Sequence, residues 1–537
     1  MRTGRLEWVR QQLAAVQTLS HIGMLNPAVG IAQGRATKAW GATPAGALAA
    51  AAHLLPAETA LIDEAGRLSF GEVDALSSAL ANALVDRGVG AGDRVAMLCR
   101  NSRWFVIAAT ALSKIGAATL YLNTGFAGPQ VVEVLEREGA TTVIYDEVFA
   151  DLIETHLTHL DLVVTDADAT SARVGAADLL AHASRRRPDP PERPGPQIIL
   201  TSGTTGTPKG AKRPNPRGLV AVTGMFQRIP WRRGDVHLVA APMFHALGNG
   251  GFQIAVQFGQ TCVTRCRFDP EDALATIDAH GVTGMTVVPV MLQRILDLGE
   301  ETIRRYDTSS LRIVHCSGAA LPGSLATRWM DRFGDNLYNV FASTEVGAAT
   351  IANPKDMRSA PGTAGQPVPG STVRLFDDDG VDVTSTGRTG RIFVGTDLAF
   401  EGYTTGGGKE QIGNLLSIGD VGHFDDGGRL FVGGRDDDMI VSGGENVYPR
   451  EVEDLLADHP AIAEVAVVGV PDEQFGQRLS AFVVLRPGAT LDADAVRAHV
   501  KANLANYKAP RDIKFLSALP RNPTGKVLKR DLLPTNA

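Results

Sequence analysis

The sequence contains little that would support a disulfide scaffold, a membrane span or a nucleic-acid surface. It has 4 cysteines in 537 residues, too few for a disulfide framework in a chain of this length. Cys262 and Cys266 lack the second Cys or His pair of a zinc set. No apolar run is long enough to cross a bilayer, and Leu13–Leu25 is interrupted by polar residues, unlike the core of a signal peptide. A net charge of −7 argues against a nucleic-acid partner. We therefore expect a cytoplasmic protein.

The residues that are present predict an α/β protein. Hydrophobic residues make up 44% of the chain and charged residues 21%, as in ordinary globular proteins. From about residue 58, short apolar runs alternate with helix-forming stretches, which favours parallel sheets with helical crossovers. We expect strands at Arg94–Cys99, Gly116–Asn123, Thr141–Asp146 and Gln197–Ser202, and a helix at Pro129–Glu138.

Two segments lie outside this rhythm. Leu6, Val9, Leu13 and Val16 recur at helical spacing and predict a helix docked on its own domain. Contact with a membrane surface is the alternative. The Pro/Arg-rich segment Ser184–Pro196 is expected to be a solvated loop, with phosphate contact by its three consecutive arginines as the alternative.

The composition changes again at Gly433–Asp438. The pattern after it predicts strand, helix, strand, strand, helix, strand, with Ala463–Val470 and Leu479–Leu485 as the clearest strands. We therefore expect layered α/β sheets in a large N-terminal domain, residues 1–433, and a small mobile α+β domain, residues 437–537, with the active site between them.

The strongest chemical signal is TSGTTGTPKG (Thr201–Gly210), directly after an apolar strand. Its glycines allow close backbone approach, its hydroxyls can donate to phosphate oxygens, and Lys209 adds a positive charge. Pro208 stands where a Walker A loop needs its second glycine, so this is a phosphate loop of another kind. The positions expected to hold phosphate are Thr201, Ser202, Gly203, Thr204, Thr205, Gly206 and Lys209.

This loop and the motifs after it resemble the adenylate-forming superfamily, which includes acyl-CoA synthetases, peptide-synthetase adenylation domains and luciferases. The resemblance covers about residue 58 to residue 530. Within the superfamily, the sequence is most similar to bacterial fatty-acid–CoA ligases. The later motifs are PMFHALG (Pro242–Gly248), SGAALP (Ser317–Pro322), NVFASTEVG (Asn339–Gly347), SIGDVGHF (Ser417–Phe424), GRDDDMIVSGGENVYPREVE (Gly434–Glu453) and PRNPTGKVLKR (Pro520–Arg530).

The resemblance implies two half-reactions. A carboxylate attacks the α-phosphorus of ATP to give an acyl-adenylate and pyrophosphate, and a thiol then attacks the acyl-adenylate and releases AMP. ATP, Mg²⁺ and coenzyme A are the implied cofactors and co-substrates. The first step brings two anions together, so it needs positive charge and positioning more than an enzyme nucleophile.

The resemblance also assigns roles to individual residues. Lys526 would bridge the carboxylate and the α-phosphate, and Glu345 would hold the magnesium ion. Thr344 would donate to the α-phosphate. Asp420 would accept hydrogen bonds from both ribose hydroxyls, assisted by Arg435.

Further positions match the adenine site. Asn339 and the backbone at Gly318 and Ala319 would contact adenine, and Phe341 would stack on it. The family usually has Tyr at position 341 and Gly at position 342, so Phe341 lacks the phenol and Ala342 adds a methyl near the acyl pocket.

The resemblance places His245 between the acyl pocket and the thiol tunnel, as a substrate-positioning residue. A buried structural histidine is the alternative. Asp437 matches the hinge position about which the C-terminal domain turns between the half-reactions. This turn would withdraw Lys526 and bring Gly443 and Gly444 to the pantetheine arm.

The substrate acid is inferred from the pocket walls. Gly248, Gly250 and Gly251 leave room in the helix expected to line the acyl pocket, and Met285–Leu292 adds apolar wall. The glycines could instead serve tight helix packing. No carrier domain follows before Ala537, so coenzyme A is the expected acceptor.

Three hypotheses follow from these features. The first is a fatty-acyl-CoA synthetase with small-molecule substrates. The second is a fatty-acyl-AMP ligase serving a carrier protein, or an aryl-acid CoA ligase. The third is a nucleotide-binding pseudoenzyme. A homodimer and weak contact with a membrane surface stay open.

Overall fold

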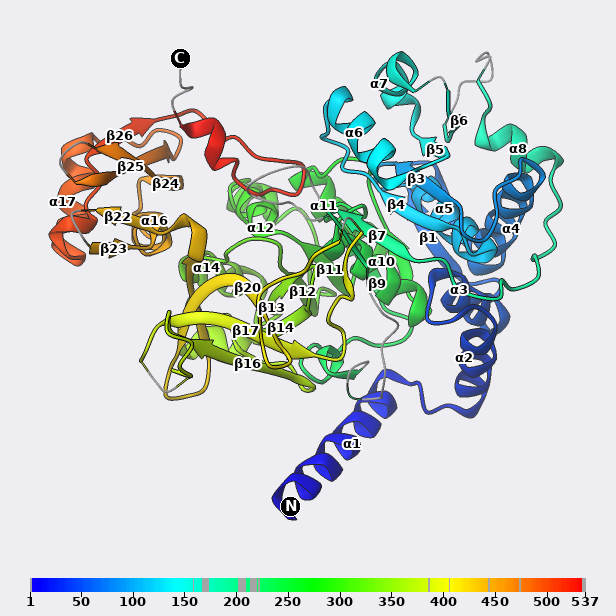
Figure 1. The fold of residues 1–537 in the computed structure, drawn as a ribbon, viewed down its shortest axis with the longest axis horizontal. Coiled ribbons are helices and arrows are strands. Elements are labelled where there is room, and N and C mark those ends of the chain that lie inside the picture. Colours follow the sequence, from blue (N-terminus) through cyan, green and yellow to red (C-terminus); the bar gives the residue numbers. More distant parts are fainter. Residues whose placement is uncertain are drawn as a thin grey trace. The chain divides into compact units, whose positions relative to one another are not determined.

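The computed structural model, drawn in Figure 1, describes most of the chain. The chain divides into two compact units. The described residues are 2–157, 159–166, 173–200, 209–212, 220, 223–384, 387–404, 406–442, 445–472 and 475–533. The first unit comprises Met1–Cys316, Ser343–Gly347 and Thr396–Gly408, and the second comprises Ser317–Ala342, Ala348–Gly395 and Lys409–Ala537. The domain division expected at residues 433–437 stays a prediction.

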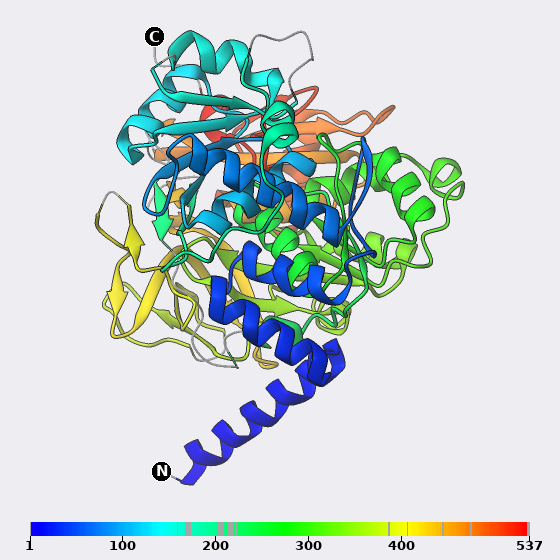
Figure 2. The same cartoon turned by 90° about the vertical axis from the view of Figure 1, so that its right-hand side faces the viewer.

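Three helices open the first unit: α1 (Arg2–Ile22), α2 (Pro27–Trp40) and α3 (Pro44–Leu54). The last two pack together through small alanines, whereas α1 extends away from them (Figure 2). In α1, Ala15 and Ile22 are buried, but Leu13 is 58% exposed and Val16 43% exposed. The predicted docking face of this helix is therefore wrong at these two positions, because spacing alone does not tell which side of a helix meets a neighbour.

A seven-stranded sheet follows, in the order β18-β8-β7-β4-β3-β5-β6. The five strands from β7 to β6 are parallel, and β8 and β18 add antiparallel at the other edge. This confirms the predicted strands and their parallel pairing. The bounds are β3 Arg94–Leu98, β4 Ala118–Tyr121, β5 Thr142–Tyr145, β6 Asp161–Val164, β7 Gln197–Leu200, β8 Gly210–Lys212 and β18 Gly402–Tyr403.

Helices cover both faces of this sheet because its strands alternate between two cores. In β3, Val95 and Met97 join one hydrophobic cluster, while Ala96 and Leu98 join another. The first cluster contains residues of α4 (Phe70–Asp86), α5 (Arg103–Ile115) and α8 (Ala176–His182), and the second contains residues of α6 (Gly128–Glu138) and α7 (Ala150–His156).

The segment Ser184–Pro196, which we call the strap, connects α8 to β7 as a solvated loop whose first residues are held by α4. The Asn82 side chain donates to the carbonyl oxygens of Ser184 (2.6 Å) and Arg186 (2.9 Å). Arg187 pairs with Asp74 at 2.6 Å, and the same carboxylate binds the fully buried ammonium group of Lys114 at 2.8 Å. The predicted solvated loop is confirmed, because no residue of the strap is buried or lies in a helix or strand, while groups on α4 hold its first residues.

The first unit also contains the strands β12, β11, β9, β10, β1 and β2, in that spatial order. All are parallel except β2. His237 on β9 is buried between Thr286 (Nε2 to Oγ1, 2.8 Å) and Gln260 (Nδ1 to Oε1, 3.2 Å). The bounds are β1 Thr59–Asp63, β2 Gly66–Ser69, β9 Val236–Val239, β10 Thr261–Val263, β11 Gly284–Val287, β12 Ile313–Cys316, α10 Ala246–Gln257, α11 Pro270–His280, α12 Pro289–Leu296 and α13 Glu300–Ile303.

The second unit holds three groups of strands. The first is β13, β14 and β15, and the second is the order β16-β17-β20-β19 with β21 beside β20. The bounds are β13 Leu337–Ser343, β14 Gly347–Ala352, β15 Gln366–Pro367, β16 Ser371–Phe376, β17 Gly390–Thr396, β19 Gln411–Ile412, β20 Leu415–Phe424, β21 Leu430–Arg435, α14 Gly323–Phe333 and α15 Pro354–Ser359.

The third group is a five-stranded sheet near the C-terminus, drawn in orange and red in Figure 1. Its order is β23-β22-β25-β24, with β26 beside β25, and α16 and α17 cover one face. The predicted element order is confirmed, apart from the additional short strand β23. The bounds are β22 Ile440–Ser442, β23 Glu445–Val447, α16 Pro449–Ala457, β24 Ile462–Asp472, β25 Gly476–Leu485, α17 Ala493–Asn503 and β26 Asp512–Phe515. Over the described part of the chain, no helix combines the length and apolarity that crossing a membrane requires.

Candidate functional site

The phosphate loop begins where β7 ends, at the carboxyl end of a parallel strand. This is where open α/β sheets place their ligands. Thr201, Ser202, Gly203, Thr204, Thr205 and Gly206 lie outside the described residues, so their predicted role stays a prediction. Lys209 is described and exposed, and β8 begins one residue after it.

Glu345, the predicted magnesium ligand, is buried with only 8% of its surface exposed. Its carboxylate accepts a hydrogen bond from the Tyr403 hydroxyl, 2.8 Å from Oε1. The Ser343 hydroxyl accepts from the backbone nitrogens of Glu345 and Val346, both at 3.3 Å, and so shapes the turn before the carboxylate. Thr344 lies in this turn and is half-buried.

No cluster of three or more metal-binding side chains occurs among the described residues. A magnesium ion at Glu345 would therefore take one protein carboxylate and complete its shell with nucleotide phosphates and water, as Mg²⁺ commonly does. Because the Tyr403 hydroxyl binds Oε1, the other carboxylate oxygen fits that role. When bound, the ion would neutralise charge on the phosphates.

The loop that carries His245 is held by two buried asparagines. Asn101 donates to the carbonyl oxygens of Val239 (3.2 Å) and Ala241 (2.9 Å), and its Oδ1 accepts from the Met243 nitrogen at 2.7 Å. Asn249 donates to the Met243 carbonyl at 3.2 Å. His245 follows this loop as the half-buried residue before α10.

The three glycines of α10 have different surroundings. A Cβ at Gly248 would lie 2.3 Å from the carbonyl oxygen of Pro242, and one at Gly251 would lie 3.0 Å from Oγ1 of Thr286. Close packing therefore explains these two glycines, whereas a Cβ at Gly250 would meet nothing within 4 Å.

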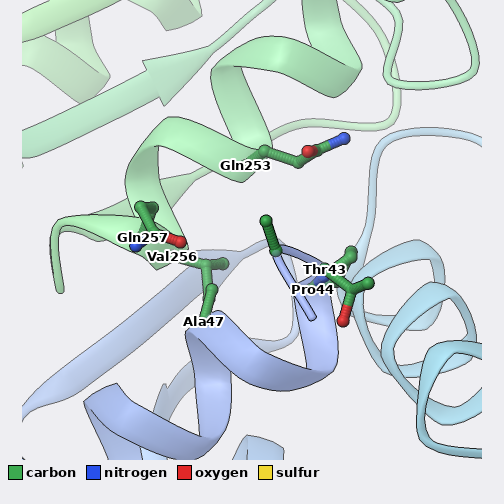
Figure 3. A pocket seen from close by; sticks show the side chains of 7 residues that line it. Thr43, Pro44, Ala47, Gln253, Val256 and Gln257 are labelled. Carbon is green, nitrogen blue, oxygen red and sulfur yellow. The ribbon is translucent and has the colours of Figure 1, made fainter. Parts of the chain in front are cut away.

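The C-terminal half of α10 borders the pocket in Figure 3. Gln253, Val256 and Gln257 meet the start of α3 there, at residues 42–44 and Ala47. None of the predicted site residues lines this pocket. We assign it no role in the chemistry.

In the second unit, Asp420 and Arg435 lie opposite each other on the paired strands β20 and β21. Arg435 Nη1 is 3.7 Å from Asp420 Oδ1 and donates to the Ile418 carbonyl at 3.1 Å. Gly419 allows this approach, because a Cβ there would lie 2.9 Å from the guanidinium group. The side chain of Asp420 is 17% exposed.

Lys526 follows a tight turn built around the Asn522 side chain. Asn522 Oδ1 accepts from the backbone nitrogens of Thr524 (3.1 Å) and Lys526 (2.9 Å) and from the Thr524 hydroxyl (2.7 Å). Gly525 adopts a positive φ of 81°, which completes the turn. The sequence therefore presents Lys526 on a short, strongly hydrogen-bonded loop.

Lys526 and Asp420 are 106 positions apart in the sequence, yet they share one electrostatic environment. Burial raises the pKa of Asp420 to about 6, and the positive charges of Arg435 and Lys526 oppose that rise. Burial and then Arg435 lower the pKa of Lys526, against the carboxylates of Asp438 and Asp420. The structure thus places Lys526 within the electrostatic field of Asp420 and Arg435, which the sequence predicted as a pair.

The short helix η3 (Asp436–Asp438) contains the predicted hinge residue and three ion pairs. Asp436 lies 3.1 Å from Arg391 of β17, and Asp437 lies 3.1 Å from Arg435. Asp438 lies 3.7 Å from the ammonium group of Lys529, which also pairs with Glu453 at 3.1 Å. The predicted hinge role of Asp437 stays a prediction.

The predicted adenine positions also lie in the second unit. Asn339 is buried and donates to the Thr363 carbonyl at 3.1 Å, and the Ser317 hydroxyl donates to the Val340 carbonyl at 2.6 Å. Gly318 and Ala319 are exposed, and Phe341 is half-buried. Gly443 and Gly444, expected at the thiol tunnel, lie outside the described residues.

Sequence reasoning missed two residues of these sites. Asn101 follows a buried strand but carries no motif signal. Tyr403 lies 58 positions from Glu345, and only the fold brings its hydroxyl to the carboxylate.

Comparison with known proteins places these motifs in one family. The model of the AMP-binding enzyme family matches residues 48–404, and that of the AMP-binding enzyme C-terminal domain matches residues 451–526. The first match covers more than half of the chain.

Curated relatives extend over nearly the whole chain. An indoleacetate–CoA ligase of Aromatoleum aromaticum is 33% identical, over 90% of this chain and 96% of the relative. A long-chain-fatty-acid–CoA ligase of Mycobacterium tuberculosis is 30% identical, over 86% of this chain and 92% of the relative. A feruloyl-CoA synthase of an Amycolatopsis species is 32% identical, over 90% of this chain and 96% of the relative.

Solved structures agree with the fold. An anthranilate–CoA ligase in complex with anthranoyl-AMP superposes with a TM-score of 0.83 at 27% identity, covering 91% of this chain and 96% of that one. An o-succinylbenzoate–CoA synthetase from Bacillus subtilis, in complex with its acyl-adenylate, gives 0.79 at 27% identity, covering 91% and 98%. The predicted α/β class is confirmed, and the chain belongs to the AMP-binding enzyme family.

Proposed function

We propose that this protein is an AMP-forming ligase that joins a hydrophobic carboxylic acid to coenzyme A. The observation that carries the proposal is the pairing of Asp420 with Arg435, 3.7 Å apart on adjacent strands, with Lys526 in the same unit and within their electrostatic field. It combines a lysine on a defined turn with a buried carboxylate and its guanidinium partner. Such a group suits the ribose and the α-phosphate of one nucleotide.

In this proposal, the ammonium group of Lys526 meets the two anions of the first half-reaction. It offsets the repulsion between the carboxylate and the α-phosphate and stabilises the charge that develops between them. Asp420 accepts the ribose hydroxyls, and Arg435 keeps that carboxylate ionised. Glu345 carries Mg²⁺, while Thr344 and Lys209 contact phosphate.

The substrate acid is proposed as a class. The chain's curated relatives act on indoleacetate, ferulate or long-chain fatty acids by name. Fatty acids are the first candidates because Met285–Leu292 is apolar. Ring-bearing acids are the second candidates. Close packing accounts for Gly248 and Gly251, so Gly250 is the one glycine of the three that can leave extra room in the acyl pocket for a ring.

The second half-reaction requires the C-terminal domain, proposed as residues 437–537, to turn about Asp437. The thiol sulfur attacks the acyl carbon, AMP leaves, and the thiol proton passes to solvent. Gly443 and Gly444 would admit the pantetheine arm in this state. His245 would position the acyl group.

Product analysis by mass spectrometry tests the proposal. The protein is incubated with ATP, magnesium and two acid series, fatty acids of increasing length and aromatic acids, with and without coenzyme A. Acyl-CoA that forms only with coenzyme A supports the ligase, and the best acid defines the substrate. Acyl-AMP that persists with coenzyme A would identify an adenylate ligase serving a carrier protein. If no acid of either series supports pyrophosphate release, the proposal is refuted.

A further inference from the structure

Tyr403 connects the predicted magnesium carboxylate to the strand that follows the phosphate loop. Its hydroxyl donates to Glu345 Oε1 at 2.8 Å. Glu345 is 8% exposed, so little water competes for that oxygen. A hydrogen bond to a buried ionised carboxylate is stronger than a neutral one and constrains the side-chain rotamer.

The backbone on either side of Tyr403 is fixed by its neighbours. Tyr403 pairs with Ala211 in the antiparallel β18–β8 ladder, and the Thr404 nitrogen donates to the Gly210 carbonyl at 2.8 Å. The Thr404 hydroxyl donates to Glu138 at 2.8 Å. The tyrosine is therefore anchored to β8, which begins directly after the predicted phosphate loop.

A second set of contacts anchors the same segment to Glu345. The Phe400 nitrogen donates to the Glu345 carbonyl at 2.7 Å. The Phe400 ring meets the Tyr403 ring edge-on, with centroids 4.9 Å apart. The ammonium group of Lys209 lies 5.4 Å from the Tyr403 ring centroid, within range of a cation–π contact. Backbone, ring and hydroxyl contacts thus converge on one tyrosine.

We propose that Tyr403 is a positioning residue for the magnesium ion. By holding Oε1 of Glu345, it would leave the other carboxylate oxygen to hold the magnesium ion. Through its contacts with β8 and Lys209, it also connects this carboxylate to the start of β8. This inference rests on the proposed function, and it adds a residue that no motif identified.

The test compares two matched tyrosine variants. Tyr403→Phe removes the hydroxyl and keeps the ring over Lys209. Tyr145→Phe is the control, because the Tyr145 hydroxyl also donates to a glutamate, Glu154, at 2.8 Å and belongs to the same unit. Two quantities are measured: the Mg²⁺ concentration for half-maximal pyrophosphate release, and Mg²⁺-dependent ATP binding by calorimetry without acid.

Tyr403→Phe should raise the half-saturating Mg²⁺ concentration by about tenfold, the factor expected for one lost hydrogen bond to a charged group. The rate at saturating Mg²⁺, the KM for the acid and ATP binding without Mg²⁺ should stay near parental values. Tyr145→Phe should leave the Mg²⁺ dependence unchanged. In a Glu345→Gln background, Tyr403→Phe should have no further effect.

Half-saturating Mg²⁺ within twofold of the parent for Tyr403→Phe would overturn the inference. So would an equal Mg²⁺ shift in Tyr145→Phe, which would mark a general stability effect. A parent protein that forms no adenylate with any acid would instead refute the proposed function. Calorimetry would then still decide whether Tyr403 governs Mg²⁺-dependent nucleotide binding.

Discussion

Replacing Lys526 by alanine should separate the two half-reactions. The substitution removes the ammonium group but keeps the turn, whose hydrogen bonds use the Asn522 side chain and the backbone of Thr524 and Lys526. We therefore expect little change in thermal stability. Removing one charge-stabilising group from an acyl- or phosphoryl-transfer site typically costs about 10²–10³-fold in rate, or about 3–4 kcal/mol.

The structure adds a second expected effect. Lys526 is one of the positive charges that lower the pKa of Asp420 against the effect of burial. Its loss should move that pKa above about 6, so nucleotide affinity should begin to fall at a higher pH than in the parent. Lys529→Ala is the matched control, because Lys529 pairs with Glu453 and Asp438 and is three positions away.

The assay is single-turnover formation of acyl-adenylate, followed by thioester formation from synthetic acyl-adenylate and coenzyme A. Lys526→Ala should lose the first activity and keep the second, while Lys529→Ala keeps the first. Adenylate formation by Lys526→Ala within threefold of the parent would refute the role given to this lysine. Equal loss in both variants would show that the charge of the whole segment matters, not Lys526.

Three further predictions follow from burial and packing. The pKa of Asp420 is raised in the folded state, so its contribution to stability is full below pH 3.8 and is lost as the pH rises through about 6. Asp420→Asn should therefore raise the melting temperature at pH 8 but not at pH 4, while weakening ATP binding. An equal shift of the melting temperature at both pH values would contradict this. Burial lowers the pKa of His237 to about 3 and of His315 to about 4, so their stabilising contribution is present above pH 6.5 and is lost as the pH falls through those values. The free energy of unfolding in urea should fall by about 1.4 kcal/mol per pH unit per histidine below pH 6.5, and His237→Asn should reduce that slope. A flat profile of this free energy from pH 7 to 5 would refute the prediction. Gly248→Ala should destabilise the protein by about 1–3 kcal/mol because the new Cβ meets the Pro242 carbonyl. Gly250→Ala should stabilise α10 by about 0.5–1 kcal/mol because a Cβ there meets nothing within 4 Å. Equal melting temperatures of the two variants would contradict the packing argument.

Local pattern predicted the elements of the fold well because buried parallel strands are short apolar runs. The stretches at residues 94–99 and 141–146 became β3 and β5 to within a residue or two. The face of α1 was not predictable, since Leu13 and Ala15 lie two positions apart and only the neighbours decide which is buried.

Some residues of the candidate site were likewise predictable from the sequence, and others were not. Motifs indicated Lys526, Asp420 and Glu345 because each lies in a short, characteristic run of residues. Tyr403 and Asn101 act through bonds that span 58 and up to 142 positions. Such contacts depend on strand order and loop path, which one sequence does not encode in any local pattern.

The strap has a consequence for how the seven-stranded sheet is threaded. From β6 at one edge, the chain must pass β5, β3 and β4 to reach β7, four strand spacings or about 19 Å. The crossing is shared between α8 and the strap, whose thirteen proline-rich residues could extend over about 40 Å. Asn82 and Asp74 fix the start of the strap through hydrogen bonds to Ser184 and Arg187. The strap therefore approaches β7 from a fixed starting point on α4.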